Sequence, residues 1–388
     1  MERLVTSNLK LGIIAGGQLG KMLIQEASKW DIATYVLDKT EECPAAAIAN
    51  HFVLGSHLDF DAVYNFGKLV DVLTFEIESV NVEALKKLKE EGVRIEPDPL
   101  ILEHIQDKGL QKQFYSDHDI PTVPYKLYES AEKIKNDLSA GTLNYPFVQK
   151  LRKGGYDGRG VAILNSEEDL PKLLEGPSVV EEKVEIDKEI AVVAARNKKG
   201  EVRCHPTVEM VFDEKANLVE KLICPSTVSE VLARKAENIA ADLIEKLDMS
   251  GLLAVEFFVD MEGKVIVNEV APRPHNSGHH TIESIITSQF EQHLRAILNL
   301  PLGSTQIKMA SVMLNLLGEE GHEGRVMYEG LTESMAIEGV KIHLYGKKLT
   351  QPYRKMGHVT VLSHVLEDAI RKADQIKKKI KVKSWTKN

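Results

Sequence analysis

Cysteine is scarce in this chain of 388 residues, which has only Cys43, Cys204 and Cys224. Three scattered thiols exclude a disulfide framework and a CxxC metal site, and they predict single buried thiols in a reducing cytosol. Long apolar runs are also missing, since none approaches the roughly 18 residues that span a bilayer. The opening MERLVTSNLKLGIIAGG has no cleavage-site pattern. We therefore expect a cytoplasmic protein without a signal peptide.

Basic residues are outnumbered by acidic ones, 49 against 58, so the formal net charge is −9. A general binder of nucleic acid or of membrane surfaces would show a basic field, and we expect neither partner. Low-complexity segments and internal repeats are absent as well. The remaining composition, 43% hydrophobic, is that of a globular chain long enough for two or three domains. Phosphate chemistry would have to come from local clusters of Lys and Arg.

Short apolar runs alternate with helix-like stretches over the first hundred residues. This alternation predicts a parallel sheet covered by helices, with ligands at the carboxyl ends of the strands. From about Pro121 the pattern becomes antiparallel, with a helix at 229–247 and a hairpin at 252–272. The chain is thus predicted to mix α/β and α+β structure. The first predicted strands are 11–15, 33–37 and 71–75.

The segment AGGQLG follows the first predicted strand and opens a helix. It nearly matches the dinucleotide fingerprint GxGxxG, with Ala15 in the first glycine position and Asp38 where a ribose-binding acid would lie. Backbone N–H groups at this helix start could hold a phosphate or another anion. The alternative is that these small residues only serve a tight turn between the strand and the helix. A nicotinamide-dependent dehydrogenase would use the motif, but would give the features below no role.

The segment KGGYDGRG lies between two predicted strands and lacks the GK[ST] ending of a P-loop, so we expect a flap. Glycines let a backbone approach phosphate oxygens closely, and nearby cations supply charge. Lys150, at the end of the preceding strand, could reach a phosphate. A plain hairpin loop is the alternative, but would not need four glycines among three cations. These residues are Gly154, Gly155, Gly158, Gly160, Arg152, Lys153 and Arg159.

Two carboxylates lie in the predicted hairpin VEFFVDMEGKVIVNE. A turn centred on residues 261–262 places Glu256 opposite Val267, with Glu269 two positions further along the same face. Diagonal neighbours of this kind lie about 7–8 Å apart, so both carboxylates could bind one divalent cation. Mg²⁺ prefers one or two carboxylates together with phosphate oxygens and water. Surface carboxylates without a cation are the alternative, and a one-residue shift of register would weaken the argument.

The segment APRPHNSGHH combines several polar residue types directly after Glu269. A zinc site is one interpretation, but histidines in a single cluster without cysteines favour it only weakly. An anion-binding loop fits the mixture better, because Arg and Ser would bind an oxyanion while His or Asn positions an amine or carbonyl. Its polar residues are Arg273, His275, Asn276, Ser277, His279 and His280. A later basic turn, whose simpler interpretation is a solvated loop, contains Lys347, Lys348, Arg354, Lys355 and His358.

In chain order these segments resemble the ATP-grasp superfamily and, within it, the N5-carboxyaminoimidazole ribonucleotide synthetases of purine biosynthesis. The segments are GGQLGKM, TFEIESV, GGYDGRG, VNEVAPRPHNSGHH and YGK…RKMGH, and the resemblance extends from about Leu11 to the 360s. It implies a ligase that uses ATP and bicarbonate to carboxylate the exocyclic amine of 5-aminoimidazole ribonucleotide (AIR). Carboxyphosphate would be the intermediate, ADP and phosphate would be released, and Mg²⁺ or Mn²⁺ would be the metal.

The resemblance also implies an organisation of the chain. We expect an N-terminal Rossmann-like domain over 1–105 and a lid subdomain with the glycine-rich flap over 106–190. A large subdomain over 191–388 would include a small C-terminal antiparallel-sheet part from about residue 300. The resemblance further implies a homodimer and a possible hand-over of product to the mutase that follows in the pathway.

Roles transfer by resemblance only to matching positions. Lys108 and Lys150 would bind ATP phosphates, Glu181 would lie at adenine and Glu189 at ribose. The residues implied for ATP are Lys108, Lys150, Gly155, Tyr156, Asp157, Gly158, Arg159, Gly160, Val161, Glu181, Glu182, Lys183, Val184, Glu189, Asn268 and Glu269. Those implied for binding AIR and bicarbonate are Gln18, Glu76, Tyr156, Arg159, Asn276, Ser277 and Arg354. Asp157, Arg273, His275 and Lys347 would act in catalysis, and Glu256 and Glu269 would hold the metal.

Two positions depart from the family pattern: Ala15 replaces a glycine, and Phe212 stands where a histidine often lies near the nucleotide. Which of Asp157 and His275 takes the proton of the attacking amine stays open. Sister enzymes such as formate-dependent glycinamide ribonucleotide transformylase or biotin carboxylase would share the paired carboxylates but use formate or biotin. A non-catalytic nucleotide-binding module would not need the PRPHNSGHH segment.

Overall fold

The N-terminal strands form a parallel sheet of five strands in the order β3-β2-β1-β4-β5. The structure, a computed structural model, describes residues 8–155, 160–213 and 218–385. Helices α1 and α9 cover one face of this sheet, and α2, α3 and α4 cover the other. Strands buried on both faces are short and apolar, which confirms the predicted parallel sheet. The strands are β1 (Lys10–Ile14), β2 (Ala33–Asp38), β3 (His51–Leu54), β4 (Val72–Phe75) and β5 (Arg94–Ile95), and the helices are α1 (Gln18–Ala27), α2 (Phe60–Gly67), α3 (Val82–Glu90), α4 (Pro99–Gln106) and α9 (Gln289–Ile297).

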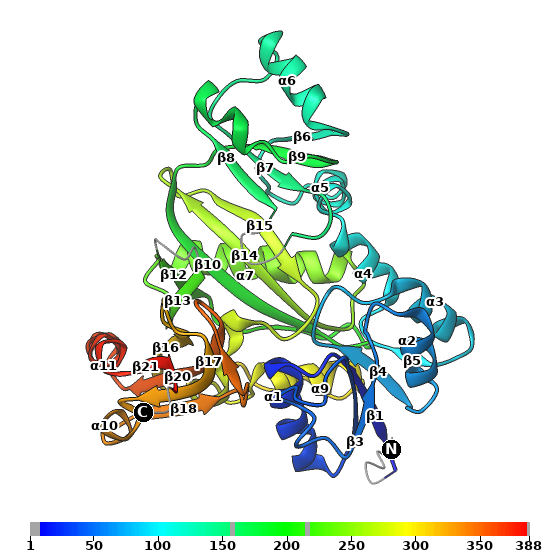
Figure 1. The fold of residues 1–388 in the computed structure, drawn as a ribbon, viewed down its shortest axis with the longest axis vertical. Coiled ribbons are helices and arrows are strands. Elements are labelled where there is room, and N and C mark those ends of the chain that lie inside the picture. The colour runs from blue at the N-terminus through cyan, green and yellow to red at the C-terminus, as the bar shows by residue number, and fades with distance from the viewer. Residues whose placement is uncertain (1–7, 156–159, 214–217, 386–388) are drawn as a thin grey trace.

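A four-stranded antiparallel sheet, ordered β6-β9-β7-β8, lies at the upper end of the molecule in Figure 1. Strands β7 and β8 are the two that the sequence predicted on either side of the glycine-rich segment, and they pair from Phe147 with Leu164 to Lys150 with Val161. Its elements are β6 (Tyr125–Tyr128), β7 (Phe147–Leu151), β8 (Val161–Leu164) and β9 (Ser178–Glu182), with α5 (Lys108–Asp117), α6 (Ala131–Ser139) and a 3₁₀ turn at Glu167–Lys172.

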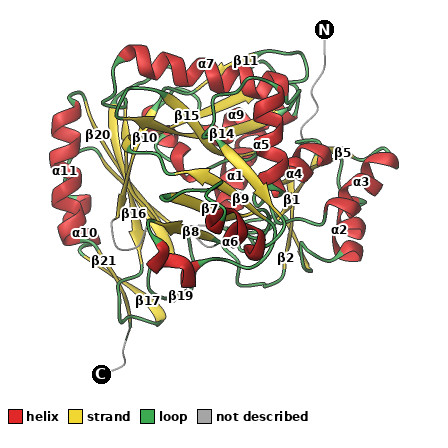
Figure 2. Ribbon diagram, turned by 90° about the horizontal axis from the view of Figure 1, so that it is seen from above, coloured by secondary structure: helices red, strands yellow, loops and turns green. Residues whose placement is uncertain are grey.

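A nine-stranded sheet forms the centre of the molecule, in the order β15-β14-β10-β12-β13-β16-β20-β18, with β11 beside β10. Helix α7 lies across this sheet and α11 packs on its other end, as Figure 2 shows from above. The strands are β10 (Ile186–Arg196), β11 (Val202–Cys204), β12 (Val208–Asp213), β13 (Leu218–Cys224), β14 (Gly251–Asp260), β15 (Val265–Ala271), β16 (Ala310–Leu317), β18 (Val340–Leu344) and β20 (Lys355–Ser363). The helices are α7 (Glu230–Lys246), α8 (Thr281–Ser284), α10 (Leu331–Met335) and α11 (Leu366–Lys379).

A small antiparallel sheet near the C-terminus pairs β17 (Gly324–Glu329) with β19 (Leu349–Thr350) and β21 (Lys381–Ser384). The fold class predicted from the sequence is therefore confirmed, with a parallel sheet first and antiparallel sheets after it. All three cysteines are free. No helix in the described ranges is both long enough and apolar enough to cross a bilayer.

The β14–β15 hairpin has a different register from the one predicted. Its turn is one residue longer, because Val259 pairs with Val265, and a β-bulge then follows beyond Phe257. Each of these steps shifts the pairing by one residue, so Glu256 lies directly opposite Glu269. The predicted pairing of Glu256 with Val267 was wrong, and the bulge brings the two carboxylates closer than the expected diagonal.

Candidate active site

Glu256 and Glu269 face each other across the bulged hairpin. The Glu256 side chain is 14% exposed and the Glu269 side chain 49%. Burial, together with repulsion from Glu269 and Glu189, raises the pKa of Glu256 to about 8. The Lys108 ammonium, 2.9 Å from Glu269 Oε2, holds the pKa of Glu269 below its ordinary value. Two carboxylates that repel each other at one point can be stabilised by a shared cation.

Lys108 reaches this point from the first residue of helix α5. Asp107 starts the helix by accepting the N–H groups of Gly109 and Leu110. The same carboxylate binds the Arg152 guanidinium through both oxygens, at 2.8 and 2.9 Å. Arg152 was expected to supply charge to the flap. Instead it holds the beginning of α5, and therefore the Lys108 side chain, in place.

Lys150 arrives at the same point from the end of β7. Its ammonium lies 2.7 Å from Glu181 Oε2 and donates to Asn268 Oδ1 at 3.0 Å. Burial opposes ionisation of Glu181, but the ammonium groups of Lys150 and Lys112 outweigh it and hold the pKa of Glu181 below its ordinary value. The structure thus brings Lys108, Lys150, Asn268 and Glu269 together around one end of the hairpin.

The other residues predicted for ATP lie on β9, on β10 and between them. Glu189, on β10, is half-buried, and burial raises its pKa to about 7 against the opposing effect of Lys150. Glu182 and Lys183 are exposed, and the Lys183 ammonium donates to Asn165. Val184 is half-buried directly after them.

The glycine-rich flap is described only at its two ends. Gly155 is half-buried, Gly160 adopts a left-handed φ of 74° and Val161 pairs with Lys150. The predicted residues Tyr156, Asp157, Gly158 and Arg159 lie outside the described residues.

The PRPHNSGHH segment places Arg273 and His275 beside the carboxylates. Arg273 binds Glu78 at 2.6 Å, and His275 Nε2 lies 3.7 Å from Glu256 Oε1. His275 Nδ1 contacts the Ser277 hydroxyl at 2.9 Å. Burial and the nearby Arg273 charge lower the pKa of His275 well below its ordinary value, so this imidazole is neutral near pH 7. In the described part of the chain, no group of three or more His, Cys, Asp or Glu side chains could hold a metal, which disfavours a zinc site.

The start of helix α1 carries an internal carboxylate. Glu76, from the end of β4, accepts the N–H groups of Gly17 and Gly20, the latter at 2.6 Å. A Cβ on Gly17 would meet Glu76 Oε1, so this approach requires glycine. Glu76 fills the place predicted for a phosphate or another anion, which removes the main argument for a dinucleotide at this motif. Gln18 follows directly as the first residue of α1.

The C-terminal basic segment is only partly solvated. Lys347 Nζ donates to the Lys355 carbonyl at 2.7 Å, and Arg354 donates to the Leu349 carbonyl at 2.8 Å. The positive charge of Lys355 acts on Glu256 and His275. His358, by contrast, is fully buried and was wrongly assigned to a solvated turn.

Three residues that the sequence did not single out support this site. Lys112 binds Glu181. Asn315 exchanges two hydrogen bonds with Asn276, both at 2.9 Å. Gln289 is bonded to the backbone N–H and C=O of His275. Their segments show only the apolar periodicity of helices and strands, so the sequence around them does not indicate a functional role.

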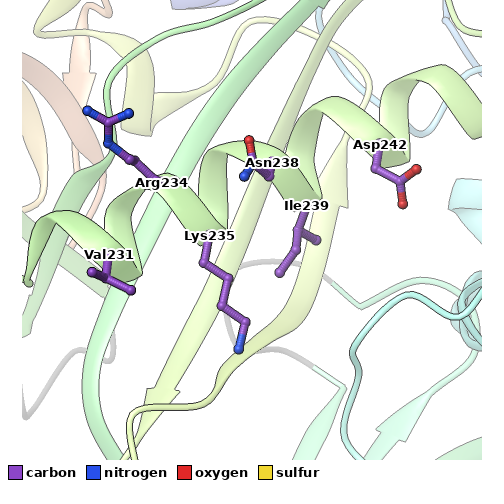
Figure 3. A pocket seen from close by; sticks show the side chains of 6 residues that line it. All are labelled: Val231, Arg234, Lys235, Asn238, Ile239 and Asp242. Atoms are coloured by element: carbon purple, nitrogen blue, oxygen red, sulfur yellow. The ribbon is translucent and has the colours of Figure 1, made fainter.

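A shallow hollow on helix α7 offers no comparable chemistry. Figure 3 shows its side chains along the outer surface of the helix, and they carry no paired carboxylates. The lining residues are Val231, Arg234, Lys235, Asn238, Ile239 and Asp242. The carboxylate and lysine cluster is therefore the stronger candidate.

The fold and this cluster define the chain as an ATP-grasp ligase. The ATP-grasp domain profile matches residues 113–290, the ribonucleotide synthetase preATP-grasp domain matches 9–106, and the phosphoribosylaminoimidazole carboxylase C-terminal domain matches 311–372. The N5-carboxyaminoimidazole ribonucleotide synthase of Brucella melitensis is 36% identical over 90% of this chain and 95% of its own length. The chain belongs to the N5-carboxyaminoimidazole ribonucleotide synthetase family.

Solved structures agree with this placement. The Thermotoga maritima synthetase superimposes with a TM-score of 0.89 at 45% identity, covering 97% of this chain and all of that one. The Aspergillus clavatus synthase, in complex with ADP and AIR, gives 0.87 at 32% identity, with 96% and 99% covered. The chloroplastic phosphoribosylaminoimidazole carboxylase of Vigna aconitifolia is 38% identical over 92% of this chain, which spans only 64% of that longer protein.

Proposed function

We propose that this chain carboxylates the exocyclic amine of AIR, using ATP and bicarbonate and releasing ADP and phosphate, in purine biosynthesis. The observation that carries the proposal is the convergence of Lys108, Lys150, Glu256 and Glu269 on one point of the β14–β15 hairpin. The Aspergillus relative that binds ADP and AIR supports the choice of substrates. Bicarbonate is the co-substrate that the family reaction requires.

ATP would lie between the four-stranded sheet and the hairpin. Lys108 and Lys150 would contact its phosphates, with the flap residues Tyr156, Asp157, Gly158 and Arg159 closing over them. Glu181, Glu182, Lys183 and Val184 would line the adenine pocket, and Glu189 would bind the ribose hydroxyls. Closure of this segment would exclude water, which would otherwise hydrolyse a reactive mixed anhydride.

Glu256 and Glu269 fit a divalent cation. The two carboxylates lie opposite each other, and Asn268 places a side-chain oxygen next to them. Mg²⁺ accepts such oxygen donors together with phosphate oxygens. The raised pKa of Glu256 reflects burial and repulsion that a bound cation would offset. When bound, Mg²⁺ or Mn²⁺ would offset negative charge on the phosphates. Lys108 and Lys150 would contribute to the same charge balance.

Bicarbonate is a poor electrophile because its carbon bears anionic oxygens and has no good leaving group. Transfer of the terminal phosphoryl of ATP to bicarbonate gives carboxyphosphate, from which phosphate can leave. Arg273 and Lys347 would steady its carboxylate. The AIR amine then attacks the carbon and loses a proton, which the neutral His275 imidazole can accept and for which Asp157 is the other candidate.

AIR would bind on the side of the cluster that faces the N-terminal sheet. Glu76 and Gln18 at the start of α1 would lie near its ribose, and Asn276, Ser277 and Arg354 would contact it, together with the flap residues Tyr156 and Arg159. A homodimer and hand-over of product to the following mutase are further parts of the proposal. All three cysteines are free, as a reducing compartment would keep them, and we infer a cytoplasmic location from this.

Release of ADP should require AIR and bicarbonate together. The assay adds each of them, singly and in combination, to the purified chain with Mg²⁺ and ATP, and follows isotopic label from bicarbonate into an acid-labile carbamate. Turnover that ignores AIR but responds to formate or biotin would keep the fold and change the substrate. No ATP turnover in any combination would contradict the proposal.

Replacing Lys347 by alanine should impair the use of AIR more than the binding of nucleotide. We expect kcat/KM for AIR to fall about 100-fold, with the Kd for ADP changed by less than about twofold. The matched control is Lys348→Ala. Lys348 binds Glu42 at the surface, and the side chains of Lys348 and Glu42 are both exposed. A variant that loses ADP binding but uses AIR normally would contradict the assigned role.

A further inference from the structure

The Glu181 carboxylate is shared by two lysines. Its Oε1 lies 2.7 Å from the Lys112 ammonium, and its Oε2 lies 2.7 Å from the Lys150 ammonium. The side chains of Lys112 and Glu181 are 5% and 3% exposed, so a bound nucleotide has almost no access to Lys112. Lys112 also donates to the Thr122 hydroxyl at 2.5 Å, which fixes the direction of its side chain.

Lys112 stands one helical turn after Lys108 on the same face of α5. Lys108 extends to Glu269, and Lys150, 14% exposed, extends to Asn268. Two of the three lysines therefore end at the hairpin where the phosphates would lie. The third ends behind them, on the carboxylate that touches Lys150.

This arrangement fixes the net charge that faces a polyphosphate. One buried carboxylate shared by two ammonium groups leaves one positive charge, whereas the same carboxylate paired with Lys150 alone leaves none. Opposite charges at 2.7 Å attract strongly where water is scarce. Without Lys112, Glu181 would therefore hold the Lys150 ammonium and cancel its charge.

We propose that Lys112 is a positioning residue for nucleotide binding: it neutralises Glu181, so that Lys150 keeps its positive charge for the phosphates. The inference rests on the proposed nucleotide site. It adds a residue that acts on the nucleotide only through Glu181 and Lys150. The variant Lys112→Met keeps the length of the side chain and removes its charge.

Isothermal titration of the full chain with ADP tests the proposal. Lys112→Met is expected to weaken ADP binding about tenfold or more, and to raise the KM for ATP by a similar factor. It should leave kcat at saturating ATP within about threefold. Lys112→Arg, which keeps the charge, should bind ADP within about threefold of the unmodified chain. Equal ADP affinity of the unmodified chain and Lys112→Met would overturn the proposal.

A double-mutant cycle distinguishes this role from simple packing. In a Glu181→Gln background no carboxylate remains to draw Lys150 away from the phosphates. There, Lys112→Met is expected to change ADP affinity by less than about threefold. A loss of the same size in both backgrounds would overturn the proposal, because Lys112 would then act without Glu181.

Breaking a buried ion pair destabilises a protein, so thermal unfolding of each variant is followed by circular dichroism. If Lys112→Met alone does not fold, Glu181→Gln is compared with the double variant, which leaves neither Lys112 nor Glu181 charged. A difference in ADP affinity above about threefold between these two overturns the proposal. Failure of the unmodified chain to bind ADP would overturn the proposed function and this inference with it.

Discussion

Replacing Glu269 by glutamine is expected to lower turnover by about 1,000-fold or more, or about 4 kcal/mol of transition-state stabilisation, while AIR still binds. Glutamine keeps the shape of the side chain and removes the charge that would hold a divalent cation opposite Glu256. It also leaves Lys108 without the carboxylate it contacts at 2.9 Å. Steady-state ADP release measures the loss, and calorimetry with AIR shows that the rest of the site is intact.

Two comparisons make that result specific. Glu262→Gln removes a carboxylate from the exposed turn of the same hairpin and should leave turnover unchanged. Raising the Mg²⁺ concentration should recover part of the activity of Glu269→Gln if the lost carboxylate binds the cation. It should recover none if the carboxylate only orients Lys108. Near-normal turnover of Glu269→Gln at ordinary Mg²⁺ would contradict the metal assignment.

The N-terminal sheet could be predicted because its strands are buried on both faces and its helices alternate with them. The helix that helps to cover one of those faces could not be predicted. Helix α9 packs beside α1 on this sheet although it comes from much later in the chain. Its apolar spacing predicts a helix but carries no information about which sheet the helix covers.

The two carboxylates were predicted from their residue type and spacing, but the geometry between them was not. A longer turn and a bulge are both compatible with the same alternation of apolar residues. The turn is fixed by the Asp260 side chain, which accepts the N–H groups of Glu262 and Lys264. The observed register follows from backbone and side-chain hydrogen bonds that hydrophobic patterning does not record.

Charged residues that act through other charged residues were the hardest to predict. In the sequence Lys112 reads as an ordinary helix lysine, and only the fold shows that it is buried against Glu181. Glu76 was named in the sequence only through family resemblance, as a residue near the AIR ribose, and its bonds to the start of α1 were not predicted. Its contact with the start of α1 depends on the pairing of β1 with β4, which brings the two segments together.

A second large effect is expected at acidic pH, because five histidines besides His275 are almost completely buried and have lowered pKa values. Burial lowers the pKa to about 3 in His205 and His293 and to about 4 in His280, and well below the ordinary value in His279 and His358. These rings stay neutral in the folded chain and become protonated on unfolding below pH 6.5. The contribution of these neutral rings to the free energy of unfolding is therefore complete above pH 6.5 and is lost as the pH falls below it.

Three carboxyl groups oppose this loss. Mainly through burial, the pKa of Glu76 and Glu189 is raised to about 7 and that of Glu256 to about 8. Near pH 5 these three groups are therefore protonated in the folded chain but mostly ionised in the unfolded chain. The five imidazoles outweigh the three carboxyls by roughly two to three protons near pH 5, which corresponds to about 3 kcal/mol per pH unit. Between pH 7 and 6 the two groups nearly cancel.

We therefore expect the free energy of unfolding, measured in urea, to change little from pH 7 to 6 and to fall steeply below that. His205 tests the cause, since neither of its ring nitrogens has a hydrogen-bond partner among the described residues. His205→Met should reduce the slope near pH 5 by about 1.4 kcal/mol per pH unit, because one fewer proton is taken up on unfolding. His364→Asn, at an exposed position, is the matched control and should leave the slope unchanged. A free energy that stays level down to pH 4.5 would mean that the buried rings are already protonated or that water reaches them.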